Sequence, residues 1–151
     1  MKLLHTADWH LGKHLEGYSR IEEQKVFIDE LVEIADEREI DMILISGDIY
    51  DTFNPPAEAE QLFYRALKRL SLQGERIICI ISGNHDSPNR LVAPSPLTYE
   101  QGIIIMDRPG FKITQNRVGN HEIVAGDEGY LEIDFKGERL VLLTLPYPSE
   151  N

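Results

Sequence analysis

Short apolar runs alternate with longer amphipathic segments along the first half of the chain. Residues 2–7, 41–46 and 76–82 are apolar and show no helical repeat, which is typical of buried strands. Residues 19–39 and 54–74 instead repeat apolar side chains at helical spacing. The order strand, helix, strand, helix, strand predicts a parallel sheet with right-handed crossovers.

Both predicted helices carry start signals and one apolar face. Ser19 with Glu22 fits a capping box, and Asn54 before two prolines fits a cap with proline in the first turn. Gly74 ends the second helix. The apolar faces contain Ile21, Ile28, Leu31, Ile34 and Ala35 in the first helix, and Leu62, Phe63, Ala66, Leu67 and Leu70 in the second. Each face is expected to pack on the sheet.

The second half of the chain predicts short strands with glycine-containing connections. Residues 131–135 alternate apolar and acidic side chains, which indicates a strand buried on one face only. The run at 140–145 is apolar and is expected to lie inside. The predicted strands cover residues 103–106, 111–114, 121–125, 130–135 and 139–145. The two halves together predict an α/β fold, a mixed β-sandwich flanked by helices, with no internal domain boundary.

Composition fits a globular protein without a membrane span. The chain has 151 residues and 42% hydrophobic content. Its apolar runs fall far short of the roughly 18 residues that a span needs, and His5 and Asp8 come too early for a secretory signal. We therefore expect a cytoplasmic protein with no membrane partner. The single cysteine, Cys79, lies between isoleucines and is interpreted as a small buried hydrophobe.

The net charge of −11 disfavours DNA binding through phosphate contacts alone, because such proteins carry basic patches. Clustered acids can instead bind divalent cations, which then face an anionic substrate. The charge balance leaves metal-assisted phosphate chemistry open.

Polar side chains follow each of the three early strands. The segments are Ala-Asp-Trp-His at 7–10, Ser-Gly-Asp-Ile-Tyr-Asp at 46–51 and Ser-Gly-Asn-His-Asp at 82–86. Each one alone fits a turn. Parallel strands bring their carboxyl ends to one edge, however, so the three segments together favour a metal site. Asp, His and Asn donors suit Mn²⁺, Mg²⁺, Fe²⁺ or Zn²⁺.

Spacing suggests how these donors act. Asp8 and His10 are two apart, so on an extended chain both side chains point the same way and can bind one ion. Asp48 has two carboxylate oxygens and could bridge two ions, while Asn84 offers a neutral oxygen.

Asp-x-His, Gly-Asp-x-x-Asp and Gly-Asn-His-Asp, in this order, resemble the motifs of the calcineurin-like metallophosphoesterases. The resemblance implies a β-sandwich around two metal ions, Mn²⁺ most of all. It implies that Asp8 and His10 bind the first ion, that Asp48 bridges and that Asn84 binds the second. His85 would be the catalytic imidazole, oriented by Asp51. The phosphoprotein phosphatases of this family have Arg-Gly after that aspartate, where this chain has Thr-Phe, which argues against a phosphoprotein substrate.

Longer stretches, among them LLHTADWHLGK and SGDIYDTFNPP, resemble a DNA nuclease branch of the family over residues 2–150. That resemblance implies a nuclease subunit of 3′–5′ exonuclease and single-strand endonuclease type, acting in DNA repair, recombination and replication. Its partners would be DNA, an ATPase subunit with a long coiled coil and, in the full-length protein, a second copy. A small-molecule phosphodiesterase or phosphatase is the alternative, and a binding module without metal comes third.

Several further residues admit two interpretations. Lys13 and His14 lie in a loop that could touch a substrate backbone, or be simply solvated. Arg90 could bind phosphate or form a surface ion pair. Trp9 could stack on a base, although packing is favoured. Two more histidines are given structural roles, with His5 in the core or behind the metal ligands and His121 in a hairpin.

The family completes its two-metal site with three further histidines, one alone and two in a Gly-His-x-His segment. This chain holds only His5, His10, His14, His85 and His121, and no two are two residues apart. We therefore expect residues 1–151 to be the N-terminal part of one catalytic domain, incomplete at its C-terminus, without the later catalytic segment or any capping domain. Such a chain should bind the first ion weakly and the second poorly. It should also expose apolar sheet edges and self-associate.

Overall fold

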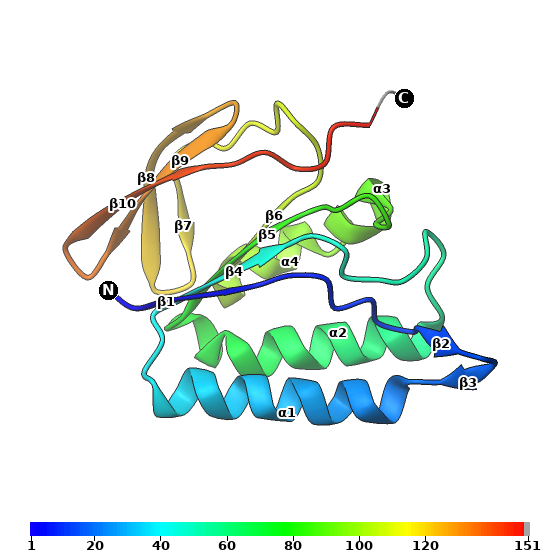
Figure 1. Ribbon diagram of the computed structural model, residues 1–151. Coiled ribbons are helices and arrows are strands. Elements are labelled where there is room, and N and C mark those ends of the chain that lie inside the picture. Colours follow the sequence, from blue (N-terminus) through cyan, green and yellow to red (C-terminus); the bar gives the residue numbers. More distant parts are fainter. Residues whose placement is uncertain (150–151) are drawn as a thin grey trace.

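A computed structural model describes residues 1–149, which fold into two sheets and a layer of helices (Figure 1). The first sheet has the order β1-β4-β5-β6, and all its neighbours are parallel. Its strands are β1 (Leu3–Thr6), β4 (Met42–Ser46), β5 (Ile77–Ile81) and β6 (Ile103–Met106). The predicted parallel sheet is confirmed.

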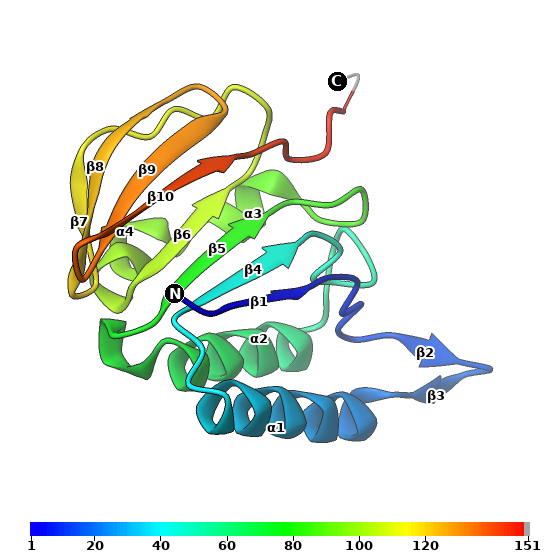
Figure 2. The same ribbon diagram turned by 60° about the vertical axis from the view of Figure 1, so that its left-hand side comes forward.

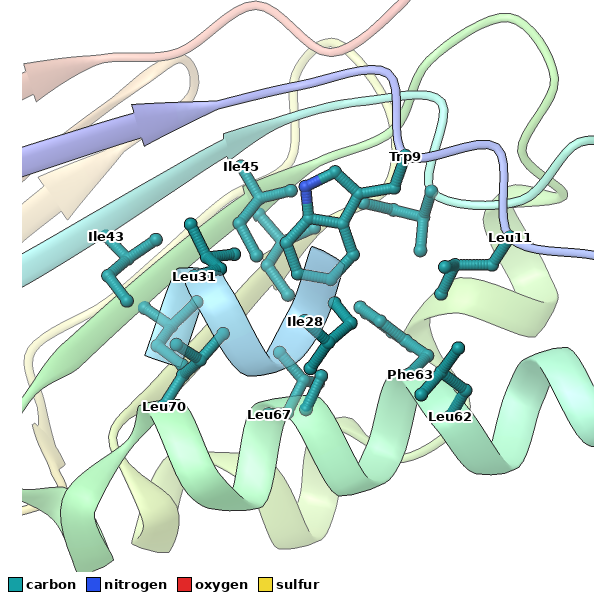
Figure 3. Close-up of a cluster of buried hydrophobic side chains, with 14 of the residues drawn as sticks. Trp9, Leu11, Ile28, Leu31, Ile43, Ile45, Leu62, Phe63, Leu67 and Leu70 are labelled. Carbon is teal, nitrogen blue, oxygen red and sulfur yellow. The ribbon is translucent and has the colours of Figure 1, made fainter. Parts of the chain in front are cut away.

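Helices α1 (Ile21–Glu37) and α2 (Ala57–Leu70) cover one face of this sheet (Figure 2). Their apolar stripes and the sheet enclose a core to which Ile28, Phe63 and Ile45 contribute, each at most 1% exposed. Figure 3 shows Trp9 in the same cluster, above the helices. The helical period therefore located the core-facing side of both helices correctly, with one exception described below.

The second sheet packs on the other face and is antiparallel, with the order β10-β9-β8-β7. Its strands are β7 (Asn116–Val118), β8 (His121–Asp127), β9 (Tyr130–Phe135) and β10 (Glu138–Leu143). A second core lies between the sheets and contains Met42, Cys79, Met106 and Ile133. The predicted mixed sandwich with helices outside is confirmed, and so is the burial of Cys79.

Small elements join the layers. A hairpin of two short strands, β2 (His14–Leu15) and β3 (Tyr18–Ser19), projects beside the start of α1 (Figures 1 and 2). The short helices between the larger elements are η1 (Leu72–Gly74), α3 (Pro88–Val92), α4 (Ser95–Thr98) and η2 (Tyr99–Gln101). None of the helices in residues 1–149 is both long and apolar enough to span a bilayer.

The predicted helix caps are wrong. Ser19 belongs to strand β3, where it pairs with His14 of β2. The cap position of α1 is therefore occupied by Arg20. Pro56, not Asn54, occupies the cap position of α2. Neither cap residue makes a side-chain cap hydrogen bond, although Ser19 Oγ accepts from the amide of Ile21 at 3.3 Å. Ile34 is 48% exposed, because it falls outside the stripe that faces the sheet.

Two strand predictions also fail. Residues 111–114 form no strand, and Lys112 makes only an isolated bridge to Glu128. The run at 140–145 is not inside, since β10 is an edge strand and its side chains alternate between two environments. Leu142 packs toward the second core, whereas Leu143 is 85% exposed. An apolar run on an edge strand is buried only on the side that a neighbouring layer covers.

Candidate metal centre

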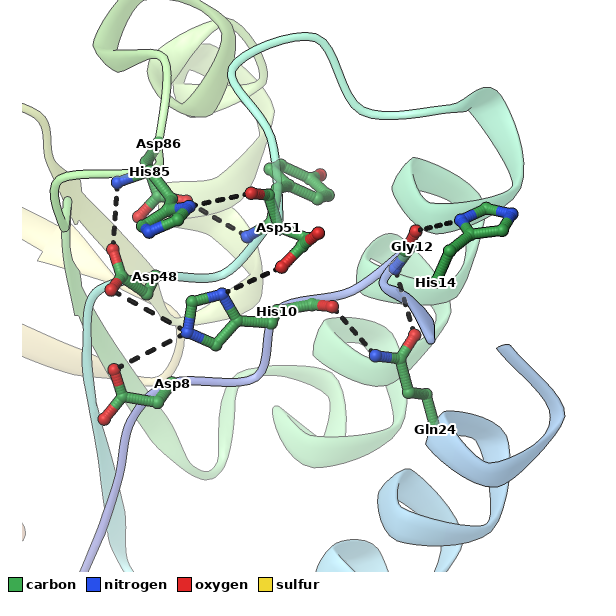
Figure 4. Close-up of polar contacts among 10 residues, drawn as sticks. Asp8, His10, Gly12, His14, Gln24, Asp48, Asp51, His85 and Asp86 are labelled. Carbon is green, nitrogen blue, oxygen red and sulfur yellow. Dashed lines mark hydrogen bonds and ion pairs between the residues drawn. The ribbon is translucent and has the colours of Figure 1, made fainter. Parts of the chain in front are cut away.

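Three segments meet at the carboxyl edge of the first sheet, as the parallel topology requires (Figure 4). Strands β1, β4 and β5 are direct neighbours, so the segments that follow them lie side by side. The amide of Asp8 donates to the carbonyl of Gly47 at 3.1 Å, and the amide of His10 donates to the carbonyl of Asp48 at 2.9 Å. These hydrogen bonds hold the first segment against the second.

The backbone at this edge is left-handed rather than extended. Asp8 has a φ of 58°, His10 of 46° and Asp48 of 50°. The expectation that Asp8 and His10 lie on extended chain is therefore wrong. Non-glycine residues in this conformation cost about 1–3 kcal/mol each, and such strain concentrates at functional sites. Here the inter-segment hydrogen bonds hold the strained geometry in place.

Glycines let the loops after β4 and β5 approach closely. A Cβ atom on Gly83 would overlap both the carboxylate and the amide nitrogen of Asp48. A Cβ on Gly47, which has a φ of 82°, would lie 2.7 Å from the Cα of Gly83. Any side chain at Gly83 would displace the Asp48 carboxylate from the site.

Two sets of potential metal donors share His10. Asp8, His10 and Asp48 form the first set, and His10, Asp51 and His85 form the second. Within each set, the donor atoms lie within 4.8 Å of one another. His10 Nε2 is 3.9 Å from an oxygen of Asp8 and 3.9 Å from an oxygen of Asp48. These separations are too long for hydrogen bonds and suit donors arranged around a common ion.

The environment of His10 also fits a metal site. Its Nδ1 is buried and lies 3.3 Å from Asp51 Oδ1, but the two atoms are not aligned for a hydrogen bond. A buried ring nitrogen without a hydrogen-bond partner is unusual in a folded protein. Carboxylate and imidazole donors at this spacing match a divalent cation such as Mn²⁺, Mg²⁺, Fe²⁺ or Zn²⁺. The residues therefore fit the ion that the sequence predicts.

Asp51 contacts His85 through its main chain, not through its carboxylate. His85 Nδ1 lies 2.7 Å from the carbonyl oxygen of Asp51, and the carboxylate of Asp51 faces His10. The amide of His85 donates to Asp48 Oδ1 at 3.0 Å. The rings of His10 and His85 meet edge to face at 4.9 Å. The structure thus gives Asp51 a different contact from the one expected.

Asn84 precedes His85 in the same loop, and its side chain is exposed. It makes no hydrogen bond with any other residue in the described range 1–149. The fold therefore brings the backbone of Asn84 to the site and leaves its amide oxygen free to bind.

The three candidate substrate contacts differ in their surroundings. Arg90 pairs with Glu60 at 2.9 Å, which favours the surface ion pair over a free phosphate contact. His14 lies in the projecting hairpin with its Nδ1 3.1 Å from the carbonyl oxygen of Gly12. Lys13 is exposed, and its ammonium forms no ion pair with residues 1–149. Of Lys13 and Arg90, Lys13 is therefore the one whose charge is unpaired within residues 1–149.

Sequence reasoning missed two residues that hold the site together. Asp86 is buried, and its carboxylate accepts from the amides of Gly83 at 2.8 Å and Tyr50 at 3.1 Å. Burial raises the pKa of Asp86, and these amide hydrogen bonds oppose the shift. Asp86 ends the Gly-Asn-His-Asp motif, which was the signal available.

Gln24 is the second missed residue, and it belongs to α1. Its amide nitrogen donates to the carbonyl of His10 at 2.8 Å, and its amide oxygen accepts from the amide of Gly12 at 3.0 Å. Figure 4 shows this side chain reaching from the helix to the first segment. No motif marks Gln24, because its role depends on how α1 packs against the loop.

The remaining histidines and Trp9 have structural surroundings. Trp9 is 5% exposed and packs edge to face against Phe63, so packing is confirmed. His121 begins the second strand of the β7–β8 hairpin, as predicted, and stacks on Phe135. His5 is exposed on β1, with its Nε2 2.7 Å from Ser46 Oγ, so the core role given to it is wrong.

Residues 1–149 match the family model named calcineurin-like phosphoesterase, and the chain belongs to this family. The family expectation drawn from the three motifs is confirmed. The last residue of the longer resemblance, at position 150, lies outside the described residues.

Two curated relatives are the D subunits of nucleases named SbcCD. The relative from Bacillus subtilis is 47% identical over 150 residues, which cover 99% of this chain and 34% of that protein. The relative from Rhodobacter capsulatus is 41% identical over 107 residues, which cover 70% of this chain and 26% of that protein. The chain thus spans about a third of the first relative's length, with 34% covered.

Proposed function

We propose that this chain carries the first part of the catalytic centre of a metal-dependent DNA nuclease subunit. The observation that carries the proposal is the pair of donor sets sharing His10 at the carboxyl edge of the sheet. Asp8, His10 and Asp48 would hold the first divalent ion, and Asp48 with Asn84 would hold the second. Bound there, two ions would supply a nucleophilic hydroxide and neutralise charge on the phosphate.

His85 acts as the catalytic imidazole in this proposal. The carbonyl of Asp51 accepts a hydrogen bond from the Nδ1–H of His85 in both the neutral and the protonated ring. Proton exchange is therefore confined to Nε2, which protonates the departing 3′ or 5′ oxygen or stabilises charge on the phosphate. A positioned general acid contributes typically about 10² to 10⁴ in rate.

Asp51, Gln24 and Asp86 position the groups that meet the substrate. Asp51 supplies the carbonyl for His85 and places its carboxylate beside His10. Gln24 holds the carbonyl of His10, and Asp86 ties the segments after β4 and β5 together. Misplacing either loop by a fraction of an ångström would weaken both the ion binding and the proton transfer.

The names of the relatives favour DNA over a small molecule as the substrate. Both relatives belong to a nuclease called SbcCD. We infer that DNA is the substrate, that an SbcC-like ATPase subunit is the partner, and that Mn²⁺ is the working ion. A homodimer, a cytoplasmic location and a role in DNA repair, recombination and replication belong to the same proposal. The donor set alone also fits a small-molecule metallophosphodiesterase, which is the second candidate function.

The proposal is tested with Mn²⁺ and three substrates: linear DNA, a cyclic nucleotide and bis-p-nitrophenyl phosphate. Calorimetric titration should show one weakly bound ion, because the donors in hand complete neither coordination shell. Cleavage should be slow and Mn²⁺-dependent, and DNA should be cut in preference to the cyclic nucleotide. Asp48→Asn should lose both Mn²⁺ binding and cleavage and retain the fold, whereas Asp29→Asn on the exposed side of α1 should change neither.

Three results would contradict the proposal. They are the absence of Mn²⁺ binding, wild-type cleavage by Asp48→Asn, and preference for the cyclic nucleotide. Two tightly bound ions would instead contradict the expectation that further histidines are needed.

A further inference from the structure

A hollow of about 430 Å³ opens directly beside the first donor set. Asp8 and His10 line it, together with Lys13, Arg20, Glu23, Gln24 and Phe27 and the segment 6–9. The volume falls within the usual range for small-ligand sites, about 300–1,000 Å³. A molecule bound there would therefore lie next to the group held by the metal.

Two cations and two carboxylates line the hollow. Lys13 and Arg20 border this space, and so do Asp8 and Glu23. Arg20 pairs with Glu23, which holds its guanidinium at the wall of the hollow. Lys13 has no acidic partner within residues 1–149, so its ammonium is available to an anion. One cation without an acidic partner suits a single phosphate group.

The hollow also offers an aromatic surface. Phe27 is 37% exposed, and the buried ring of Trp9 supports it edge to face at 5.8 Å. A held aromatic ring with an open side suits a nucleobase, because every base has a face that can stack.

We propose that this hollow binds one nucleotide of the DNA strand next to the scissile phosphate. The base stacks on Phe27, and the phosphate of that nucleotide contacts Lys13. The inference rests on the proposed function, because it takes the group at Asp8 and His10 to be the scissile phosphodiester. It adds a site that orients the strand and is tolerant of base identity, since stacking requires no hydrogen-bond readout.

Thymidine 5′-monophosphate is the probe, because it carries a base and a phosphate but has no phosphodiester to cleave. Trp9 is the chain's only tryptophan and contacts Phe27, so its fluorescence reports on the hollow. Titrations in Mg²⁺ compare this nucleotide with thymidine and with inorganic phosphate. The nucleotide should bind more tightly than either component, because it engages both parts of the hollow.

The variants separate the base contact from the phosphate contact. Phe27→Ala should weaken nucleotide binding by about 5- to 150-fold and leave phosphate binding unchanged. Phe27→Tyr should bind like wild type, since it keeps the ring. Lys13→Ala should weaken both nucleotide and phosphate by about 2- to 5-fold. Val26→Ala on the same helix and Lys112→Ala near the second sheet lie outside the hollow and should have no effect.

Nucleotide affinity that is undetectable in wild type, or unchanged in Phe27→Ala, would overturn this inference. An equal loss in Val26→Ala would also overturn it. Calorimetry with Mn²⁺ on the same proteins separates this failure from failure of the proposed function. Phe27→Ala should keep the wild-type Mn²⁺ isotherm, whereas absent Mn²⁺ binding in wild type would overturn the proposed function whether or not the nucleotide binds at Phe27.

Discussion

The Nδ1 atom of His85 lies 2.7 Å from the main-chain carbonyl oxygen of Asp51, while the carboxylate of Asp51 points to His10. One residue therefore lies against two imidazoles through two different groups. The main-chain contact survives any substitution of the side chain at position 51 that keeps the loop in place. The roles of the carboxylate and of the backbone can thus be separated by mutation.

Asp51→Asn should leave the ring of His85 unchanged and perturb His10. The carbonyl that accepts from His85 belongs to the backbone, whereas the altered side chain faces His10 Nδ1. We expect Mn²⁺ affinity to fall by about 10- to 100-fold, as for other groups that support metal ligands. Ring ¹⁵N chemical shifts of both histidines, measured without metal, check the assignment. A shift at His85 as large as that at His10 would show that the carboxylate orients both rings.

His85→Ala should retain Mn²⁺ binding and lose about 10² to 10⁴ in hydrolysis rate, because the role proposed for the imidazole is proton transfer. The amide of residue 85 still donates to Asp48 Oδ1, so the carboxylate of Asp48 keeps its position. Calorimetry and bis-p-nitrophenyl phosphate hydrolysis measure the two effects on one preparation. His14→Ala in the projecting hairpin serves as the control. Weaker Mn²⁺ binding in His85→Ala would make His85 a metal ligand.

Arg76→Met should destabilise the fold by about 3 kcal/mol. The guanidinium is 2% exposed and donates to the carbonyls of Ile40 at 2.7 Å, Leu70 at 2.8 Å and Ala35 at 3.1 Å. Methionine would leave these carbonyls buried without donors, and such groups are costly. Urea unfolding measures the change.

Arg69→Met is the matched control for Arg76→Met. Arg69 pairs with Asp29 on the surface, and exposed pairs contribute at most about 1 kcal/mol. Equal losses of unfolding free energy in the two variants would show that the hydrogen bonds from Arg76 to the buried carbonyls contribute little to stability.

The thiol of Cys79 should make stability fall in alkali. Burial raises the pKa of Cys79 from 9.0 to about 12. Between these values the unfolded chain loses the thiol proton and the folded chain keeps it, so unfolding becomes more favourable by about 1.4 kcal/mol per pH unit. Urea unfolding at pH 8 and pH 10 should show this loss in wild type. Cys79→Ala lacks it, and an identical pH dependence in the two proteins would contradict the expected burial.

The sequence alone determined the order of the helices and strands and which residues belong to the candidate site. Helical periodicity placed α1 and α2, and alternation placed the buried face of β9. The parallel order of β1, β4 and β5 then required Asp8, Asp48 and His85 to meet at one edge. Periodicity records which side of each element is buried, and topology follows from element order, so both can be obtained from the chain alone.

Tertiary structure decided which atoms of those residues face one another. The left-handed backbone at Asp8 and His10 depends on hydrogen bonds to residues about 40 positions away, which no local pattern encodes. The same applies to Asp51, whose carbonyl rather than carboxylate reaches His85. Leu143 is exposed because β10 lies at a sheet edge, although its sequence is as apolar as that of a buried strand. The local sequence sets the chemistry and the spacing of the side chains. Contacts between distant segments set how each side chain is oriented and whether it is buried.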